Sequence, residues 1–387
     1  MKQLLTRHLI LAVSLLSVTA VTFADSPSIS LNDLKQKITK PQFQNESFDS
    51  ESILKSRYVS WGVQPENQSS SINIVDAWKK FEGKKEIVVA VIDTGIDPTH
   101  PFLKDNLYTK NGSASATNYG IDFSKSTKNK LQPIDTHGHG THVSGIIKSV
   151  FPKVRILPLK YYDKTASGKD NLDSTIAALR YAVDSGVDII NYSGGGPEPD
   201  YAELEILKKA EAKGILVVAA AGNEESNIDQ EKNAYFPASY KLSNIITVTA
   251  YNQSLQILSS SNYGKNSVDV AAPGYRIKSS LNFGKAGFLT GTSQATAFVS
   301  GVAALLKAQF PEITAAQMKK VIIESAKKEF SFTNKCKSEG RVDAAKAQEV
   351  AAKLLNHGND TKVAKNEKKR DLANSKSTGK IIYRLNR

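Results

Sequence analysis

The sequence predicts an α/β fold with a mostly parallel central sheet and helices on both faces of that sheet. Residues 87–92 read Ile-Val-Val-Ala-Val-Ile, a continuous apolar run that suits a strand buried on both faces. Similar short apolar runs recur through the middle of the chain, and amphipathic helical patterns lie between or after them. Strands that alternate with helices indicate a parallel sheet, because parallel neighbours need a long crossover connection.

The expected elements follow in chain order. We expect strands at residues 87–92, 155–160, 187–191, 215–220 and 244–250. We expect helices at residues 172–184, 201–213, 294–308 and 314–326. Asp200 and Glu203 have the spacing of a capping box at the start of the second of these helices. Gly214 provides the stop signal between that helix and the next strand.

The composition is that of a globular protein. The chain has 387 residues, of which 40% are hydrophobic and 23% are charged, which excludes a disordered or fibrous chain. Cys336 is the single cysteine, so it cannot close an intrachain disulfide or build a cysteine-based zinc site alone. This excludes a disulfide-stapled mini-protein, and we expect the Cys336 thiol to be inert.

The two ends of the chain differ from its middle. Residues 1–24 have the pattern of a secretory signal peptide, with Lys2 and Arg7 before an apolar run at 9–21 and a candidate cleavage site at Thr22-Phe23-Ala24. That run is shorter than the roughly 18 residues of a membrane span. We therefore expect export, to the periplasm or the medium. Residues 25–55 are polar and weakly patterned, and we expect a short propeptide or an N-terminal arm.

The C-terminal residues 356–387 predict a flexible basic tail. From residue 359 onward the sequence has nine Lys or Arg and three Asp or Glu, within a chain of net charge +13. Such a tail is either solvated without a function or a weak attachment to anionic surfaces. We expect no specific nucleic-acid partner.

Candidate catalytic groups lie where an α/β sheet places its ligands, outside the carboxyl ends of the strands. Asp93 follows the first strand, and Asn223 follows the strand at 215–220. His139 and Ser293 lie near helix starts. A serine hydroxyl needs a histidine to take its proton, and an acid to orient that histidine. An amide donor can bind the oxyanion that forms, so these residue types make acyl transfer plausible.

Five sequence blocks resemble those of the subtilisin-like serine peptidases, the subtilases. They read VVAVIDTGID at 88–97, HGTHVSG at 139–145, IINYSGGGP at 189–197, VVAAAGNE at 217–224 and GTSQATAFVSG at 291–301. The resemblance covers about residues 56–350. It implies a peptidase domain at 56–355 and a secreted serine endopeptidase that acts on polypeptides as a monomer.

The resemblance also implies a role for each matching residue. Asp93 would orient His139, His139 would act as general base and acid, and Ser293 would be the nucleophile. Asn223 would donate to the oxyanion, together with the Ser293 N–H.

The resemblance further implies where a substrate binds. One edge of the cleft would be an extended segment, and its residues would be Ser193, Gly194 and Gly195. The opposite edge would be Gly168, Lys169 and Asp170. Glu224 would lie at the rim of the first specificity pocket, where it either favours a basic residue before the cleaved bond or is a solvated carboxylate.

The sequence departs from the family pattern in two places. Phe102 occupies a position that usually supplies a calcium carboxylate, so we expect no tight calcium there, although a calcium site elsewhere stays open. Ala297 stands where family members usually have a proline that is often cis, so we expect a trans or a strained peptide bond there. We expect no cofactor and no catalytic metal.

Several alternatives have to be set against this interpretation. Asp93-Thr94-Gly95 matches the aspartic-peptidase tripeptide, but that class needs two such carboxylates and the sequence has one DTG. An esterase is disfavoured because Ser293 lacks a Gly-x-Ser-x-Gly elbow. An exported binding protein with an inactive peptidase fold remains a competing hypothesis.

The remaining histidines have simpler expected roles. His137, His139 and His142 have a spacing that could ligate a metal, but the spacing also arises from the HGTHVSG block. We expect His137 to face solvent or to lie behind the catalytic groups. We expect His142 to be structural and His100 to lie in a surface turn.

Overall fold

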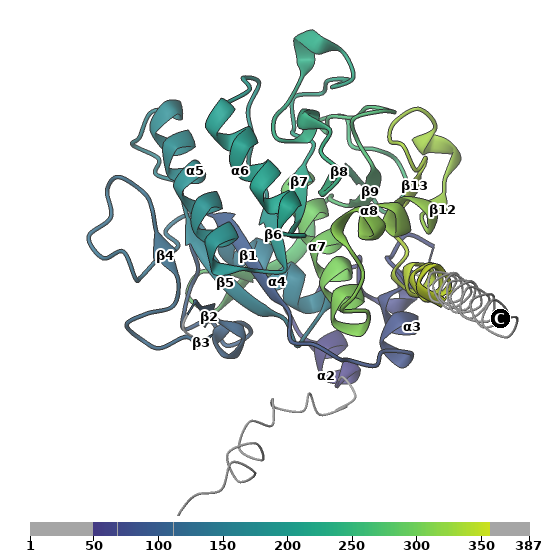
Figure 1. Ribbon diagram of the computed structural model, residues 1–387. Helices are drawn as coiled ribbons and strands as arrows, with labels where there is room; N and C mark the ends of the chain where they lie inside the picture. The colour runs from purple at the N-terminus through teal and green to yellow at the C-terminus, as the bar shows by residue number, and fades with distance from the viewer. Residues whose placement is uncertain (1–48, 68, 111, 357–387) are drawn as a thin grey trace, which may run out of the picture. The chain divides into compact units, whose positions relative to one another are not determined.

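The computed structural model describes residues 49–67, 69–110 and 112–356. The signal peptide expected at 1–24, most of the arm expected at 25–55 and the basic tail from 357 onward lie outside the described residues. A nine-stranded sheet forms the centre of the described part, with the strand order β12-β13-β9-β8-β7-β6-β1-β5-β4 (Figure 1). All neighbouring pairs are parallel except β12 with β13.

The five expected strands form the middle of this sheet. They are β1 Val88–Asp93, β5 Arg155–Lys160, β6 Ile189–Tyr192, β7 Leu216–Ala220 and β8 Ile245–Tyr251. Each lies within two residues of the bounds expected from the sequence. The shorter strands at the edges are β4 Ile121–Asp122, β9 Val270–Pro273, β12 Lys327–Lys328 and β13 Gly340–Arg341. These edge strands carry no long apolar run, so the sequence analysis did not find them.

Helices cover both faces of the sheet, as predicted (Figure 1). On one face α4 His139–Val150 and α7 Thr292–Gln309 pack together in the larger hydrophobic core. On the other face α5 Gly168–Ser185 and α6 Tyr201–Ala212 pack together in the smaller core. Strand side chains alternate between the two cores, with Val89 and Val91 in the first and Ala90 and Ile92 in the second. The continuous apolar run therefore reflects burial on both faces.

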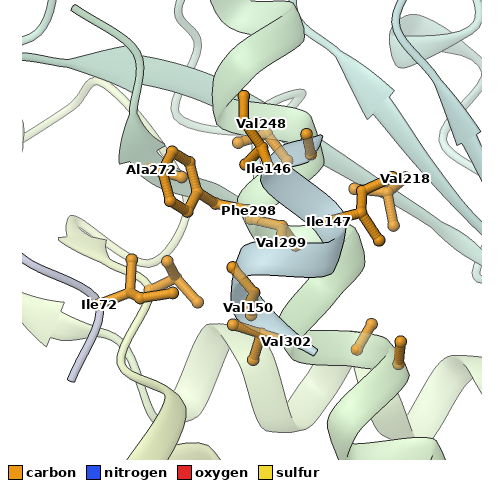
Figure 2. Close-up of a cluster of buried hydrophobic side chains, with 14 of the residues drawn as sticks. Ile72, Ile146, Ile147, Val150, Val218, Val248, Ala272, Phe298, Val299 and Val302 are labelled. Carbon is orange, nitrogen blue, oxygen red and sulfur yellow. The ribbon is translucent and has the colours of Figure 1, made fainter. Parts of the chain in front are cut away.

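The α4–α7 contact fixes the two helices that carry His139 and Ser293. Ile146, Ile147 and Val150 of α4 lie against Phe298, Val299 and Val302 of α7 (Figure 2). A Cβ on Gly301 would lie only 2.5 Å from the Cβ of Val150, so glycine is required for the helices to approach this closely. Both helices begin at the carboxyl edge of the sheet, so the candidate catalytic segments at their N-terminal ends lie at that edge.

Two helix starts differ from the expectation. The helix α5 begins at Gly168, four residues before the expected start, because the Ser167 side chain caps it by accepting from the Asp170 N–H at 3.1 Å. The expected capping box on α6 is half formed. Asp200 accepts from the Glu203 N–H at 3.0 Å, but the Glu203 carboxylate accepts from the Tyr192 hydroxyl instead. Gly214 follows α6 with a φ of 72°, as its stop role predicts.

The remaining elements surround this centre. They are helices α2 Ser50–Lys55, α3 Ile74–Lys79 and α8 Ala315–Glu324, a helix at 344–356, the pair β2 Tyr108–Thr109 and β3 Gly112–Ser113, and the hairpin β10 Ile277–Leu281 and β11 Lys285–Leu289. Thr314 and Gln317 form a complete capping box on α8. In the described part of the chain, no helix is long and apolar enough to cross a membrane.

Candidate active site

The candidate catalytic residues meet at the carboxyl edge of three adjacent strands. Asp93 is the last residue of β1, and Ser193 directly follows β6, which pairs with β1 in the register Ile92 to Tyr192. Asn223 follows β7, the next strand along. The sheet order changes direction here, since β5 lies on one side of β1 and β6 on the other. Such a switch point is where open α/β sheets bind ligands.

Asp93 and His139 form a hydrogen-bonded pair. The Asp93 Oδ1 lies 2.7 Å from the His139 Nδ1, and the same oxygen accepts from the Thr94 N–H at 2.7 Å. Asp93 is 3% exposed, whereas the His139 side chain is 23% exposed. A carboxylate on Nδ1 fixes the tautomer in which Nε2 is the free base.

The surroundings of His139 favour its protonated form. Burial opposes the imidazolium, but the charge and the hydrogen bond of Asp93, with a smaller contribution from Asp135, outweigh it and raise the pKa of His139 above its ordinary value. A base whose pKa is raised in this way accepts a serine proton more readily than an ordinary imidazole, and the imidazolium then gives the proton to a leaving group.

Asp135 organises the His139 loop, a role that the sequence analysis did not assign. Its buried carboxylate accepts from the N–H groups of Gly138 and Thr141 and from the Thr94 and Thr141 hydroxyls. The Thr94 hydroxyl also accepts from the Gly140 N–H, which ties the end of β1 to the start of α4. Although burial opposes it, this set of donors lowers the pKa of Asp135. A carboxylate shortly before a helix start is the sequence signal that could have found it.

The Ser293 hydroxyl rests on the neighbouring strand rather than on the imidazole. Its Oγ donates to the Ser193 carbonyl oxygen at 3.1 Å, and no hydrogen bond joins Ser293 to His139 among the described residues. Ser293 is the second residue of α7, in the first turn, where backbone N–H groups have no partner within the helix. Catalytic hydrogen bonds are often long or unformed without a substrate, and rotation about one side-chain bond moves the hydroxyl between staggered positions.

Asn223 is oriented by the residue that precedes Ser293. Its Oδ1 accepts from the Thr292 N–H at 3.0 Å, and the Thr292 hydroxyl lies 3.3 Å from the same oxygen. Because the amide is planar, this contact directs the Nδ2 group away from Thr292, and the Asn223 side chain is exposed. The Asn223 Nδ2 and the Ser293 N–H can therefore donate to one anion at the end of α7, where the helix dipole also favours negative charge.

The segment after β6 suits an extended substrate. Within the described chain no hydrogen bond engages the backbone of Gly194 or Gly195. Gly196 is paired with Phe236 in an antiparallel bridge, with N–O distances of 2.8 and 3.0 Å. The free backbone groups at 194 and 195 can bind a peptide backbone.

The opposite edge expected at Gly168, Lys169 and Asp170 is not extended. These residues form the first turn of α5, and the Asp170 carboxylate pairs with Lys125. A helical turn cannot extend a β-ladder, so these residues do not offer a strand edge, and their place along a substrate stays a prediction. The Ser-x-x-Asp pattern from Ser167 to Asp170 was the signal for a helix cap.

Glu224 is exposed, but one of its oxygens is engaged. The Glu224 Oε2 accepts from the Asn262 Nδ2 at 2.5 Å, and the same amide donates to the Ala221 carbonyl at 2.9 Å. The carboxylate is therefore held against the turn that carries Asn223 rather than freely solvated.

The three other histidines in the described part of the chain are not part of the catalytic group. His137 is exposed, as expected. His142 is fully buried, its Nε2 lies 2.9 Å from the Ile277 carbonyl, and burial lowers its pKa to about 4. His100 is also fully buried, so the prediction that it lies in a surface turn is wrong. Its Nδ1 accepts from the Phe102 N–H, and its Nε2 bonds the Lys285 carbonyl. None of the described His, Cys, Asp and Glu side chains gathers in threes to hold a metal.

The departures from the family pattern have structural explanations. Phe102 is buried and stacks on Tyr58 with ring centroids 5.3 Å apart, so this position offers no oxygen ligand. Ala297 lies inside α7, and the peptide bond before it is trans. Cys336 is buried, and burial raises the pKa of its thiol, which agrees with an inert role.

The chain is similar to known serine proteases. The model of the Subtilase family matches residues 84–363. A thermophilic serine proteinase of Bacillus sp. strain AK1 is 37% identical over 243 residues, which cover 60% of this chain and 55% of that protein. The major intracellular serine protease of Bacillus subtilis strain 168 is 36% identical over 247 residues, 61% of this chain and 73% of that protein.

A third relative belongs to the same group. Subtilisin E of Bacillus subtilis strain 168 is 37% identical over 242 residues, 60% of this chain and 58% of that protein. The matched region spans between about half and three quarters of these relatives. With the family model covering most of the chain and the same order of motifs along it, the chain belongs to the subtilase family.

Proposed function

We propose that this chain is an exported serine endopeptidase that hydrolyses polypeptides through an acyl-enzyme intermediate. The observation that carries the proposal is the 2.7 Å hydrogen bond between Asp93 and His139, which leaves the His139 Nε2 free to act as a base. The names of the similar proteins, all serine proteases or subtilisins, support the same reaction.

In the proposed reaction the His139 Nε2 takes the Ser293 hydroxyl proton as the Ser293 oxygen attacks the peptide carbonyl carbon. The Asn223 Nδ2 and the Ser293 N–H donate to the oxyanion of the tetrahedral intermediate. The carbon–nitrogen bond then breaks, and His139 gives its proton to the leaving amine. A water molecule attacks the acyl-enzyme by the same steps and restores the Ser293 hydroxyl.

The Ser193 carbonyl has a place in this scheme. In the resting molecule it accepts from the Ser293 hydroxyl at 3.1 Å. A substrate that pairs with the 193–195 segment competes for the backbone groups there, and the proposal requires the freed hydroxyl to turn toward the imidazole.

Replacing the nucleophile tests the proposal. Ser293→Ala is expected to remove hydrolysis of an unfolded protein substrate such as casein while leaving the melting temperature near that of the wild type. Hydrolysis by purified Ser293→Ala at the wild-type rate would overturn the proposed function. A wild type that binds polypeptides or anionic polymers but never cleaves them would instead support a binding protein.

The proposed export rests on the signal pattern at residues 1–24. One similar protein is named as intracellular, so location varies among the relatives and needs its own test. Expression with the native N-terminus should give a protein outside the cytoplasm whose first residue, read by N-terminal sequencing, lies near 25 if residues 25–55 are an arm or near 56 if they are a propeptide. A cytoplasmic protein that retains Met1 would contradict export.

We also propose that the basic C-terminal residues attach the protein weakly to anionic surfaces, while the peptidase domain acts as a monomer. From residue 359 onward basic residues outnumber acidic ones by nine to three. Deletion of 359–387 is expected to lower the salt concentration needed for elution from heparin, without a change in peptidase activity. An unchanged elution would show that the tail is a solvated segment.

A further inference from the structure

Two segments that leave adjacent parallel strands contact the start of α7, through the Ser193 carbonyl and the Asn223 side chain, and the region between these segments is the space in question. One is Ser193–Gly195 after β6, and the other is Gly222–Glu224 after β7. In the proposed reaction the scissile carbonyl carbon meets the Ser293 Oγ and its oxygen meets the Asn223 amide, so we infer that the residue before the cleaved bond lies against these two segments. The side chain of that residue then points between the two segments.

We propose that the ring of Tyr235 fills this space and restricts the chain to cleavage after small residues such as Gly, Ala and Ser. This inference rests on the proposed peptidase function, and it names the class of peptide that the site accepts.

The position of the ring follows from its distances to both walls. A Cβ built on Gly195 would lie 2.4 Å from the Tyr235 Cε1 and 2.9 Å from its Cζ. A Cβ built on Gly222 would lie 3.0 Å from the same Cζ. The phenol end of Tyr235 therefore touches the wall on each side, and little width remains between the walls for a second large side chain.

The backbone of Tyr235 is held on both sides, which fixes the point from which the ring projects toward Gly195 and Gly222. The Tyr235 N–H donates to the Ser239 hydroxyl at 3.0 Å, and its carbonyl accepts from the Ser239 N–H at 2.8 Å. The next residue, Phe236, is paired with Gly196 on the substrate edge. A shift of the Tyr235 backbone would therefore break contacts that also fix the substrate edge.

The polar groups around this space, the Tyr235 hydroxyl and the Glu224 carboxylate, do not form a binding site for a basic side chain. Burial, with a smaller contribution from Glu224, raises the pKa of Tyr235, so its hydroxyl is neutral. A Cβ on Gly222 would lie 2.4 Å from the Glu224 Oε2, so this carboxylate covers the Gly222 wall while it accepts from Asn262. A lysine or arginine chain long enough to pass Glu224 would need the room that Tyr235 occupies.

The test compares peptides that differ only in the residue before the cleaved bond. Succinyl-Ala-Ala-Pro-Xaa-p-nitroanilides with Xaa as Ala, Phe or Lys give kcat/KM for each residue. The wild type is expected to favour Ala over Phe and Lys by at least tenfold, since even one methylene in a pocket changes kcat/KM by roughly 10- to 200-fold. Tyr235→Ala is expected to raise the Phe-to-Ala ratio by at least tenfold.

Two control variants separate loss of the ring from general damage. Tyr235→Phe keeps the ring and should keep the preference for Ala. Tyr181→Ala removes a half-buried tyrosine on α5, where its ring contacts Phe123, and should leave the ratio unchanged. The wild-type panel needs no variant to fold, so it tests the proposal by itself.

The unfavourable outcomes are distinct. A wild type that cleaves after Phe as fast as after Ala, or an unchanged ratio in a folded Tyr235→Ala, overturns the role of Tyr235. A wild type that prefers Lys overturns it in favour of a Glu224-lined basic pocket. Absence of fluorophosphonate labelling at Ser293 and of all peptide hydrolysis would overturn the proposed function itself.

Discussion

Opposing influences act on the His139 imidazole. Burial favours its neutral form, whereas Asp93 at 2.7 Å favours the imidazolium, and the net effect raises the pKa of His139 above its ordinary value of 6.5. A general base works only when it is neutral, so activity should rise as the pH increases through this raised pKa.

A pH profile tests this balance. We expect the acid limb of wild-type kcat/KM to lie above pH 6.5. Asp93→Asn removes the negative charge, so the limb should move to lower pH, and kcat should fall by about 10⁴, the size seen when a serine protease loses this acid. A limb that stays at the same pH in Asp93→Asn would contradict the assigned role of Asp93.

The amide of Asn223 is exposed, so its loss should affect the reaction and not the fold. Asn223→Ala is expected to lower kcat by about 10²–10³ with little change in KM, which is the loss seen when subtilisin loses an oxyanion donor. Asn233→Ala is the matched control, because that amide faces Asn227 and Gln230 of its own loop. Equal kinetics for the two variants would remove Asn223 from the site.

At the scale of elements, the site depends on how α4 and α7 cross. Each helix carries a catalytic candidate in its first turn, so a change in their separation alters the distance from His139 to Ser293. Gly301 lies at the contact with Val150 and leaves no room for a methyl group.

We therefore expect Gly301→Ala to reduce both stability and activity. An added Cβ 2.5 Å from the Val150 Cβ forces the helices apart, at a cost of about 1–3 kcal/mol in the free energy of unfolding. Gly168→Ala is the control, because nothing lies within 4 Å of the added methyl group. Thermal unfolding and kcat/KM are the measurements, and equal values for Gly301→Ala and the wild type would contradict the tight crossing.

The contact between α4 and β10 predicts a pH dependence of stability. His142 is neutral in the folded chain, because burial lowers its pKa to about 4, while the unfolded chain protonates it below about pH 6.5. Its contribution is present above pH 6.5 and is lost as the pH falls toward 4, by roughly 3 kcal/mol at most.

Urea unfolding between pH 7 and pH 4 measures this effect. The loss of stability over that range should be smaller in His142→Gln, which keeps a donor for the Ile277 carbonyl but does not titrate. His137→Gln, at an exposed position, should show the wild-type slope. A wild-type slope in His142→Gln as well would show that His142 does not carry the dependence.

At the scale of the whole molecule, the fold was predictable where local patterns determine it. Buried parallel strands such as Val88–Asp93 are apolar on both faces, so the run in the sequence marks them directly. Because such strands align their carboxyl ends, the residues after them, Asp93, Ser193 and Asn223, were expected at one edge of the sheet. The structure brings them there.

What the sequence analysis missed depends on contacts between distant segments. His100 is buried beside the hairpin β10–β11, where its Nε2 bonds the Lys285 carbonyl. Tyr235 lies close to Gly195 because the next residue, Phe236, pairs with Gly196. No local pattern encodes such contacts. The helix start at Gly168 is different, because the Ser167 cap that sets it is a local signal present in the sequence.

The claim that joins these scales is that the fold makes the Ser293 hydroxyl nucleophilic through His139. Peptide mass spectrometry after treatment with a fluorophosphonate measures this most directly, in the wild type and in His139→Ala. We predict one adduct per wild-type molecule, on Ser293, and no adduct on His139→Ala under the same conditions. No wild-type adduct, an adduct on another residue, or equal labelling of His139→Ala would contradict it.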